Sequence, residues 1–306
     1  MRKLLLSFIG LVIIGLGNIF ILKTGGCEII KHKIPFELKG ILYYREAGDG
    51  IFKYNFLEDK LEKTLLKGAI YNEFIFLSLP LEESPPYRTF RLRKYNLKGK
   101  IIEEWELPTT HPMWGSCNQA LSPNQRLVAR VRKINRGQFY RLVVSPLNRL
   151  YEEVITEDLG YSGIVWILNT DLLYIDINNE LIQINISTKE KQKLGYKEIS
   201  PDALSPDGKY VLCSKDSPFY ELCAIYLLHV QDMKLTKLTR CGGTPRNFIW
   251  SPDGKYFIFS KYRHPLISLL QGLLEMEDVY VYSFEHKKAY RLIESTYLSG
   301  GFWLEE

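Results

Sequence analysis

Leu204-Ser-Pro-Asp-Gly-Lys-Tyr210 recurs, with one residue changed, as Trp250-Ser-Pro-Asp-Gly-Lys-Tyr256. In each copy proline suits the second position of a type I turn, aspartate can accept hydrogen bonds from the backbone, and glycine suits a corner with positive φ. Each turn lies between an apolar pair of residues and a run rich in β-forming residues, which is the pattern of a β-hairpin. We therefore interpret Asp207 and Asp253 as turn-capping residues rather than as acid or metal sites.

Weaker copies precede these two, at Leu121-Ser-Pro-Asn-Gln-Arg-Leu127 and Trp166-Ile-Leu-Asn-Thr-Asp-Leu172. The copies lie 45, 38 and 46 residues apart along the chain. Each continues into a third strand and a shorter, charged fourth strand, as expected of stacked four-stranded blades. Two upstream units fit the same strand order without the turn sequence. The sequence therefore predicts an all-β, six-bladed β-propeller, closed by Gly301–Leu304 as the innermost strand of the first blade.

The Ser-Pro-Asp-Gly-Lys sequence after an apolar strand resembles the TolB-type, WD40-like propeller repeat, over roughly residues 38–304. The resemblance implies the six-bladed ring and suggests interactions in the cell envelope. It carries over no catalytic residues, because the repeated sequence is structural.

The amino terminus is a separate segment. Arg2 and Lys3 precede 19 uncharged residues, Leu4–Leu22, as in an export signal or an anchor helix. Lys23-Thr-Gly-Gly-Cys27 then resembles a bacterial lipoprotein signal with Cys27 as the lipidated residue, although an uncleaved transmembrane anchor fits equally well. We expect a signal or anchor at 1–26, a tether at 27–37 and a propeller at 38–306, membrane-anchored and extracytoplasmic, in the periplasm or at the cell surface.

The composition is consistent with a propeller that does not bind nucleic acid. The net charge of +5 falls to +2 without Arg2, Lys3 and Lys23, and a nearly neutral chain with scattered charges does not indicate nucleic-acid binding. The spacing of the cysteines and histidines does not suggest a metal site, and we expect no cofactor. Cys213 and Cys223 flank a turn-like segment centred on residue 218, which predicts either a disulfide between facing strands or two buried thiols.

The strand order of a propeller divides its connections between two faces. The Ser-Pro-Asp-Gly turns and the turns between third and fourth strands share one end, here called the turn face. The connections between second and third strands and between successive blades share the other end, here called the loop face. Loops on a rigid scaffold are the usual place for recognition, so we expect a ligand or partner site on the loop face. The candidate residues there are His111, Trp114, Tyr161, Arg246 and Tyr297.

An insertion at 262–278 carries apolar residues at helical spacing, which predicts a short helix. This helix either packs on the ring or forms a partner-binding knob through its leucines, which are Leu269, Leu270, Leu273 and Leu274.

Catalytic signatures are missing from the sequence, because neither a Gly-x-Ser-x-Gly elbow nor a phosphate-binding glycine loop occurs. We therefore expect a non-enzymatic, membrane-tethered scaffold that binds a protein partner or an envelope component. The alternative is a hydrolase, lyase or lactonase with an axial carboxylate or metal site, since such a site leaves no local motif. A third possibility is a purely structural or sensory ectodomain on a transmembrane helix.

Overall fold

The structure is a computed structural model that describes residues 34–46, 50–64, 69–71, 74–80, 89–96, 100–108, 119–124, 126–133, 140–146, 152–160, 163–215, 223–241, 243–262, 277–296 and 298–304. These residues form 24 β-strands and no helix. Among them, no helical segment has the length and apolar character needed to cross a bilayer. The predicted signal or anchor at 1–26 lies outside the described residues.

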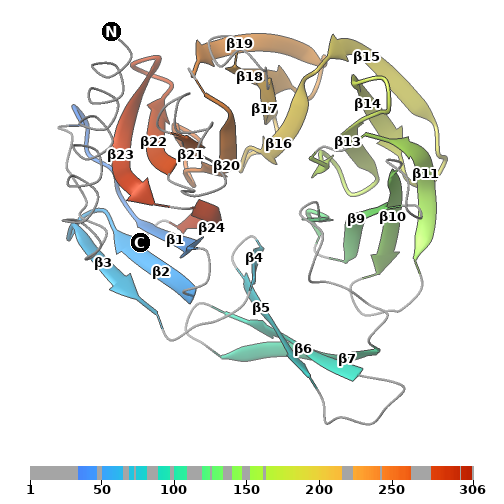
Figure 1. Cartoon of the computed structure of the whole chain (residues 1–306), viewed down its shortest axis with the longest axis horizontal. Coiled ribbons are helices and arrows are strands. Elements are labelled where there is room, and N and C mark those ends of the chain that lie inside the picture. The colour runs from blue at the N-terminus through green and yellow to red at the C-terminus, as the bar shows by residue number, and fades with distance from the viewer. Residues whose placement is uncertain are drawn as a thin grey trace, which may run out of the picture.

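The strands form six antiparallel sheets of four strands each (Figure 1). The first sheet, in spatial order, is β24 (Leu298–Leu304), β1 (Ile41–Glu46), β2 (Gly50–Asn55) and β3 (Lys60–Lys63). The second comprises β4 (Ala69–Tyr71), β5 (Phe74–Pro80), β6 (Thr89–Tyr95) and β7 (Ile101–Pro108). The third comprises β8 (Gln119–Leu121), β9 (Leu127–Lys133), β10 (Tyr140–Pro146) and β11 (Glu153–Leu159).

The remaining three sheets follow in chain order. The fourth comprises β12 (Val165–Trp166), β13 (Asp171–Ile175), β14 (Glu180–Asn185) and β15 (Lys191–Lys197). The fifth comprises β16 (Ser200–Leu204), β17 (Tyr210–Lys215), β18 (Ala224–His229) and β19 (Lys234–Arg240). The sixth comprises β20 (Pro245–Trp250), β21 (Tyr256–Tyr262), β22 (Glu277–Ser283) and β23 (Lys288–Thr296).

The two ends of the described chain meet in the first sheet. Strand β24 pairs antiparallel with β1, with Tyr43 opposite Phe302 and Leu42 opposite Trp303. Gly301 permits the close approach, because a Cβ at this position would lie 2.4 Å from the carbonyl oxygen of Tyr43. The prediction that Gly301–Leu304 forms the end strand of the first sheet is therefore confirmed, and β1 lies between β24 and β2 instead of at an edge.

The apolar cores lie between neighbouring sheets. One core joins the first and sixth sheets, for example through Leu42 and Ile258, and another joins the third and fourth sheets through Leu142 and Leu172. Two further cores join the fourth to the fifth and the fifth to the sixth. The fourth and fifth sheets are buried on both faces. Consecutive positions of their central strands are therefore apolar, as in Leu172–Tyr174 and Val211–Cys213.

The repeated turns have the expected chemistry. The Ser205 hydroxyl donates to Asp207 Oδ1 at 2.7 Å, and the same carboxylate oxygen accepts from the backbone N–H of Lys209 at 3.1 Å. Gly208 has φ of 72°, the left-handed conformation that favours glycine. Ser251 and Asp253 repeat these contacts at 2.7 and 3.0 Å. The capping role predicted for Asp207 and Asp253 is confirmed.

Tryptophan side chains join successive sheets. The indole N–H of Trp250 donates to the carbonyl oxygen of Ala203 in the preceding sheet at 3.2 Å. Trp166 donates in the same way to Ala120 at 2.9 Å. Each indole therefore packs between two sheets and donates a hydrogen bond to a backbone carbonyl of the preceding sheet.

Residues just before β1 pack on the body of the protein. Ile34 and Phe36, which the sequence assigned to the tether, lie against the core between the first and sixth sheets. The Phe36 ring stacks on Tyr256 and on His286, with ring centroids 4.9 and 5.2 Å apart. Tyr256 follows a Ser-Pro-Asp-Gly turn and His286 lies in the turn between β22 and β23, so this segment runs along the turn face.

The predicted bridge between Cys213 and Cys223 is not present, and both residues are buried thiols. Cys213 pairs across the hairpin with Tyr226, three residues beyond Cys223. An odd displacement along a strand also reverses the face of the sheet. Cys213 accordingly packs toward the fourth sheet and Cys223 toward the sixth. The disulfide alternative was wrong because Cys213 is paired with Tyr226 and not with Cys223, and the alternative of two buried thiols is confirmed.

Candidate functional site

Arg246 is the one predicted loop-face residue that the structure describes. His111, Trp114, Tyr161 and Tyr297 lie outside the described residues, as do Cys27 and the leucines of the predicted knob, which are Leu269, Leu270, Leu273 and Leu274. The site can therefore be built upward from Arg246 and the residues around it on the loop face of the sixth sheet.

Arg246 is exposed at the start of β20, and a local irregularity in the sheet sets its position. It pairs with Ser260, but the register shifts before Ile249, and Asn247 in between has φ of 55°. The Asn247 side-chain amide donates to the Ser260 hydroxyl at 3.0 Å. A bulge of this kind redirects side chains at a strand end. Here the hydrogen bond between Asn247 and Ser260 fixes the backbone that carries Arg246.

Lys261 follows Ser260 on β21, next to this bulge. Its ammonium group donates to the carbonyl oxygen of Cys241 and lies 4.5 Å from the centroid of the Tyr280 ring. Burial lowers the pKa of Lys261, while the charges of Cys241 and Asp278 oppose that change. Lys261 therefore links the segment that leads into β20 to the second strand of the sixth sheet.

Two acids lie on the adjacent strand, β22. Asp278 pairs with Lys261 across the strands, and its carboxylate lies 3.6 Å from the Arg291 guanidinium. Asp278 and Glu277 are each only 1% exposed. We call Arg246, Lys261, Glu277, Asp278 and Arg291 the sixth-sheet charge cluster. Three of its members, Lys261, Asp278 and Arg291, lie beside one another, so the Asp278 carboxylate offsets part of the positive charge.

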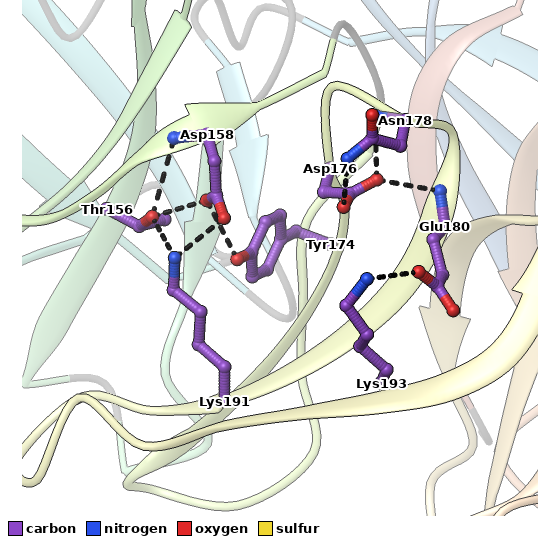
Figure 2. A network of polar contacts seen from close by, with 8 residues as sticks. All are labelled: Thr156, Asp158, Tyr174, Asp176, Asn178, Glu180, Lys191 and Lys193. Carbon is purple, nitrogen blue, oxygen red and sulfur yellow. Dashed lines mark hydrogen bonds and ion pairs between the residues drawn. The ribbon is translucent and has the colours of Figure 1, made fainter.

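A second polar network joins the third and fourth sheets (Figure 2). The Lys191 ammonium donates to Asp158 Oδ2 and to the Thr156 hydroxyl, each at 2.7 Å, and the Tyr174 hydroxyl donates to Asp158 Oδ1 at 3.0 Å. Burial alone would raise the pKa of Asp158, but these hydrogen bonds and that of Thr156 outweigh it and lower the pKa. Burial and the Asp158 charge raise the pKa of Tyr174.

The same network continues into the loop-face turn between β13 and β14 (Figure 2). Asp176 Oδ1 accepts from the backbone N–H groups of Asn178 and Glu180 at 2.9 and 2.8 Å, and Lys193 donates to Glu180 at 2.8 Å. The backbone N–H of Ile177 also donates to the carbonyl oxygen of Asp158 at 2.8 Å. These bonds hold the fourth strand of one sheet against a turn of the next, so we interpret the network as structural.

The part of the chain that the structure describes holds no group of three or more His, Cys, Asp or Glu residues that could bind a metal ion. Its two histidines on the sixth and fifth sheets take part in turns. His229 contacts Asp232 at 2.8 Å, and His286 contacts the Ser283 hydroxyl at 3.0 Å.

Chemically, the sixth-sheet charge cluster suits recognition. A general acid or base must reach its substrate, whereas Glu277 and Asp278 are buried and Lys261 donates to a backbone carbonyl. Arg246 is the exposed member, and a guanidinium on a fixed backbone suits binding of a carboxylate or phosphate. Sequence reasoning identified Arg246 but missed Lys261 and Asp278, because only the pairing of β21 with β22 brings these two together.

Comparisons with solved structures give the class of the fold. The structure is similar to TolB from Acinetobacter baumannii, with a TM-score of 0.47 and 17% identity over 82% of this chain and 67% of that one. It is also similar to a protein assigned as TolB from Agrobacterium tumefaciens, with a TM-score of 0.50 and 14% identity over 85% and 92% of the two chains. An oligogalacturonate lyase in complex with manganese gives a TM-score of 0.48 and 12% identity over 80% and 70%.

Four-stranded antiparallel sheets that follow one another around a centre, with cores between them, define a β-propeller (Figure 1). Together with the likeness to the Agrobacterium tumefaciens protein, they identify the fold as a TolB-like propeller. The sequence itself matches no protein-family profile and no curated protein. The likeness therefore concerns the fold.

Proposed function

We propose that the protein is a non-enzymatic binding scaffold, tethered to a membrane by its amino terminus on the extracytoplasmic side. In this proposal the six sheets are the six blades of one closed ring. The apolar segment Leu4–Leu22, with Arg2 and Lys3 before it, supports the tether. The TolB-like fold supports a role in protein binding or in binding of an envelope component.

The position of residues 34–40 determines which face of the propeller, the turn face or the loop face, such a tether leaves available for binding. Phe36 packs against Tyr256 and His286 on the turn face. Seven residues, 27–33, separate this segment from the predicted anchor, and they can span at most about 25 Å when extended. The turn face would then lie close to the membrane, and the loop face would point away from it.

The observation that carries the proposal is the exposed Arg246 on the hydrogen-bonded bulge of β20. It lies on the face opposite the proposed attachment, and hydrogen bonds of Asn247 and Ser260 hold the strand that carries it. A rigid, exposed guanidinium favours a partner that presents a carboxylate, a phosphate or an acidic surface.

Site-specific photo-crosslinking in intact envelopes tests the proposal. A photoreactive phenylalanine analogue replaces Arg246 on the loop face, or Lys255 on the turn face as the matched control. We expect a discrete cross-linked species from position 246 that is absent from position 255. Equal cross-linking from both positions, or none from position 246, would contradict the proposed binding face.

The tether has its own test. Lipidation at Cys27 predicts that Cys27→Ser shifts the mature protein to the mass of its uncleaved form. An uncleaved anchor predicts that the same substitution leaves the mass of the full-length chain unchanged except for the substitution itself. Recovery of the unaltered protein in the soluble cytosolic fraction would contradict both forms of attachment.

A further inference from the structure

Cys223 and Cys241 are neighbours across two strands. Ala224 pairs with Arg240 in the ladder between β18 and β19, and the next position brings Cys223 opposite Cys241. The backbone N–H of Cys241 donates to the carbonyl oxygen of Cys223 at 3.1 Å. Facing residues of a hydrogen-bonded antiparallel pair have Cα atoms about 5.5 Å apart. Disulfides span Cα separations of about 4.4 to 6.8 Å, so this pair lies within range.

Both side chains also lie in the same place. Cys223 is 0% exposed and Cys241 is 7% exposed, and both belong to the apolar core between the fifth and sixth sheets, with Phe257 and Phe259. Cys213, by contrast, packs into the core on the other side of the fifth sheet. Two thiols on facing positions and on one side of a sheet can meet without a change of strand register.

Cys241 is the more reachable thiol and has a cation beside it. The Lys261 ammonium donates to the carbonyl oxygen of Cys241, which brings a positive charge next to this residue. A nearby ammonium group favours the thiolate, which is the reactive form of cysteine. Cys241 also begins the segment that leads into β20, whereas Cys223 is fully buried.

We infer that Cys223 and Cys241 form a reversible disulfide by exchange with a small-molecule disulfide. The Cys241 thiolate attacks one sulfur of that disulfide and displaces the first thiolate. The Cys223 sulfur, after losing its proton, then attacks the Cys241 sulfur and displaces the second. The protein loses two protons and two electrons, which together equal two hydrogen atoms, and the small-molecule disulfide takes them up to become two thiols.

Such a bond would tie the first residue after β19 to the residue before β18, at the loop face. The segment from Cys241 to Pro245 leads directly into the strand that carries Arg246. Oxidation would therefore restrain the start of β20 against the fifth sheet. This inference depends on the register of β18 and β19 and not on the proposed binding function.

Peptide mapping of the full-length protein tests the inference. The folded protein is incubated with oxidised glutathione, alkylated in denaturant and digested with trypsin without reduction. We expect the peptide 216–234, which contains Cys223, to be joined to 241–246, which contains Cys241, with loss of two hydrogen atoms. Reduction with dithiothreitol should separate them. The peptide 210–215 should carry Cys213 in alkylated form, as an internal control.

Two variants sharpen the test. Cys223→Ala should stop the reaction at a mixed disulfide between Cys241 and glutathione, because the resolving thiol is missing. Cys213→Ala should leave the joined peptides unchanged. Recovery of both wild-type peptides as separate alkylated species, of a mixed disulfide in the wild type, or of Cys213 in a bridge would overturn the inference.

Discussion

At the residue scale, one serine and one acid build each repeated turn. Asp207 and Asp253 accept a hydroxyl and a backbone N–H, and Asn124 accepts the equivalent pair in the third copy at 2.7 and 3.1 Å. An amide oxygen can therefore replace a carboxylate oxygen in this turn. The negative charge of the aspartates stabilises the turn further, since hydrogen bonds to a carboxylate are stronger than those to a neutral acceptor.

The double variant Asp207→Asn, Asp253→Asn measures that contribution. The hydrogen bond from Ser205 and that from the Lys209 backbone lower the pKa of Asp207, and the pKa of Asp253 is also lowered. A lowered pKa contributes stability above the unfolded value of about 3.9, and this stability is lost as pH falls through the folded pKa. We expect a loss of up to about 1 kcal/mol per turn at pH 7.

Urea denaturation from pH 7 down to pH 3 provides the measurement. The stabilities of the wild type and the double variant should converge as the pH falls below about 4. A difference in unfolding free energy that stays constant across this pH range would mean that the charge of Asp207 and Asp253 does not stabilise the turns.

At the element scale, contacts between sheets matter more than any one strand. Trp250 belongs to the innermost strand of the sixth sheet, and its indole reaches the innermost strand of the fifth. Its ring stacks with Phe284 at a centroid distance of 5.6 Å. The side chain thus combines apolar packing with one hydrogen bond between sheets, and substitutions can separate these two contributions.

Trp250→Phe should cost about 1 kcal/mol, because it removes the donor to Ala203 but keeps an aromatic ring. Trp250→Ala should cost about 3 to 5 kcal/mol, because it also leaves a cavity. Trp166→Phe provides a matched comparison in the fourth sheet, where the indole donates to Ala120. Urea unfolding of the three variants tests this account, which fails if Trp250→Ala is no more costly than Trp250→Phe.

The sixth-sheet charge cluster makes a second prediction at this scale. Asp278→Ala leaves Lys261 and Arg291 without their shared carboxylate, and we expect a loss of about 3 kcal/mol, as for a broken buried ion pair. Asp232→Ala removes an exposed contact to His229 and should destabilise the protein much less than Asp278→Ala. Similar losses in thermal or urea unfolding would show that burial of Asp278 has no energetic consequence.

Sequence reasoning succeeded for these elements where the information is local. The Ser-Pro-Asp-Gly turns predicted the hairpins and the capping roles, because a turn depends on four neighbouring residues. It failed for Cys213 and Cys223, because one connection of uncertain register reverses a side chain from one core to the other. It also missed Lys261 and Asp278, whose proximity exists only through strand pairing.

At the scale of the whole molecule, the two ends of the described chain meet in the first sheet. Strand β24 comes from the end of the described chain and pairs with β1, near its beginning, while Trp303 donates to the carbonyl oxygen of Lys39 at 2.7 Å. This pairing brings the sixth sheet against the first and defines the two faces. The position of Phe36 on the turn face, and hence the proposed orientation at a membrane, follows from the same arrangement.

An engineered disulfide between the two ends tests this arrangement most directly. Tyr43 and Phe302 are paired, and their rings stack with centroids 5.2 Å apart, whereas Trp303 packs into a different core. Tyr43→Cys with Phe302→Cys should therefore form a bridge in high yield on mild oxidation, detected by non-reducing peptide mapping. The control pair, Tyr43→Cys with Trp303→Cys, should not. Failure of the first pair, or equal bridging by both, would contradict the pairing of β24 with β1.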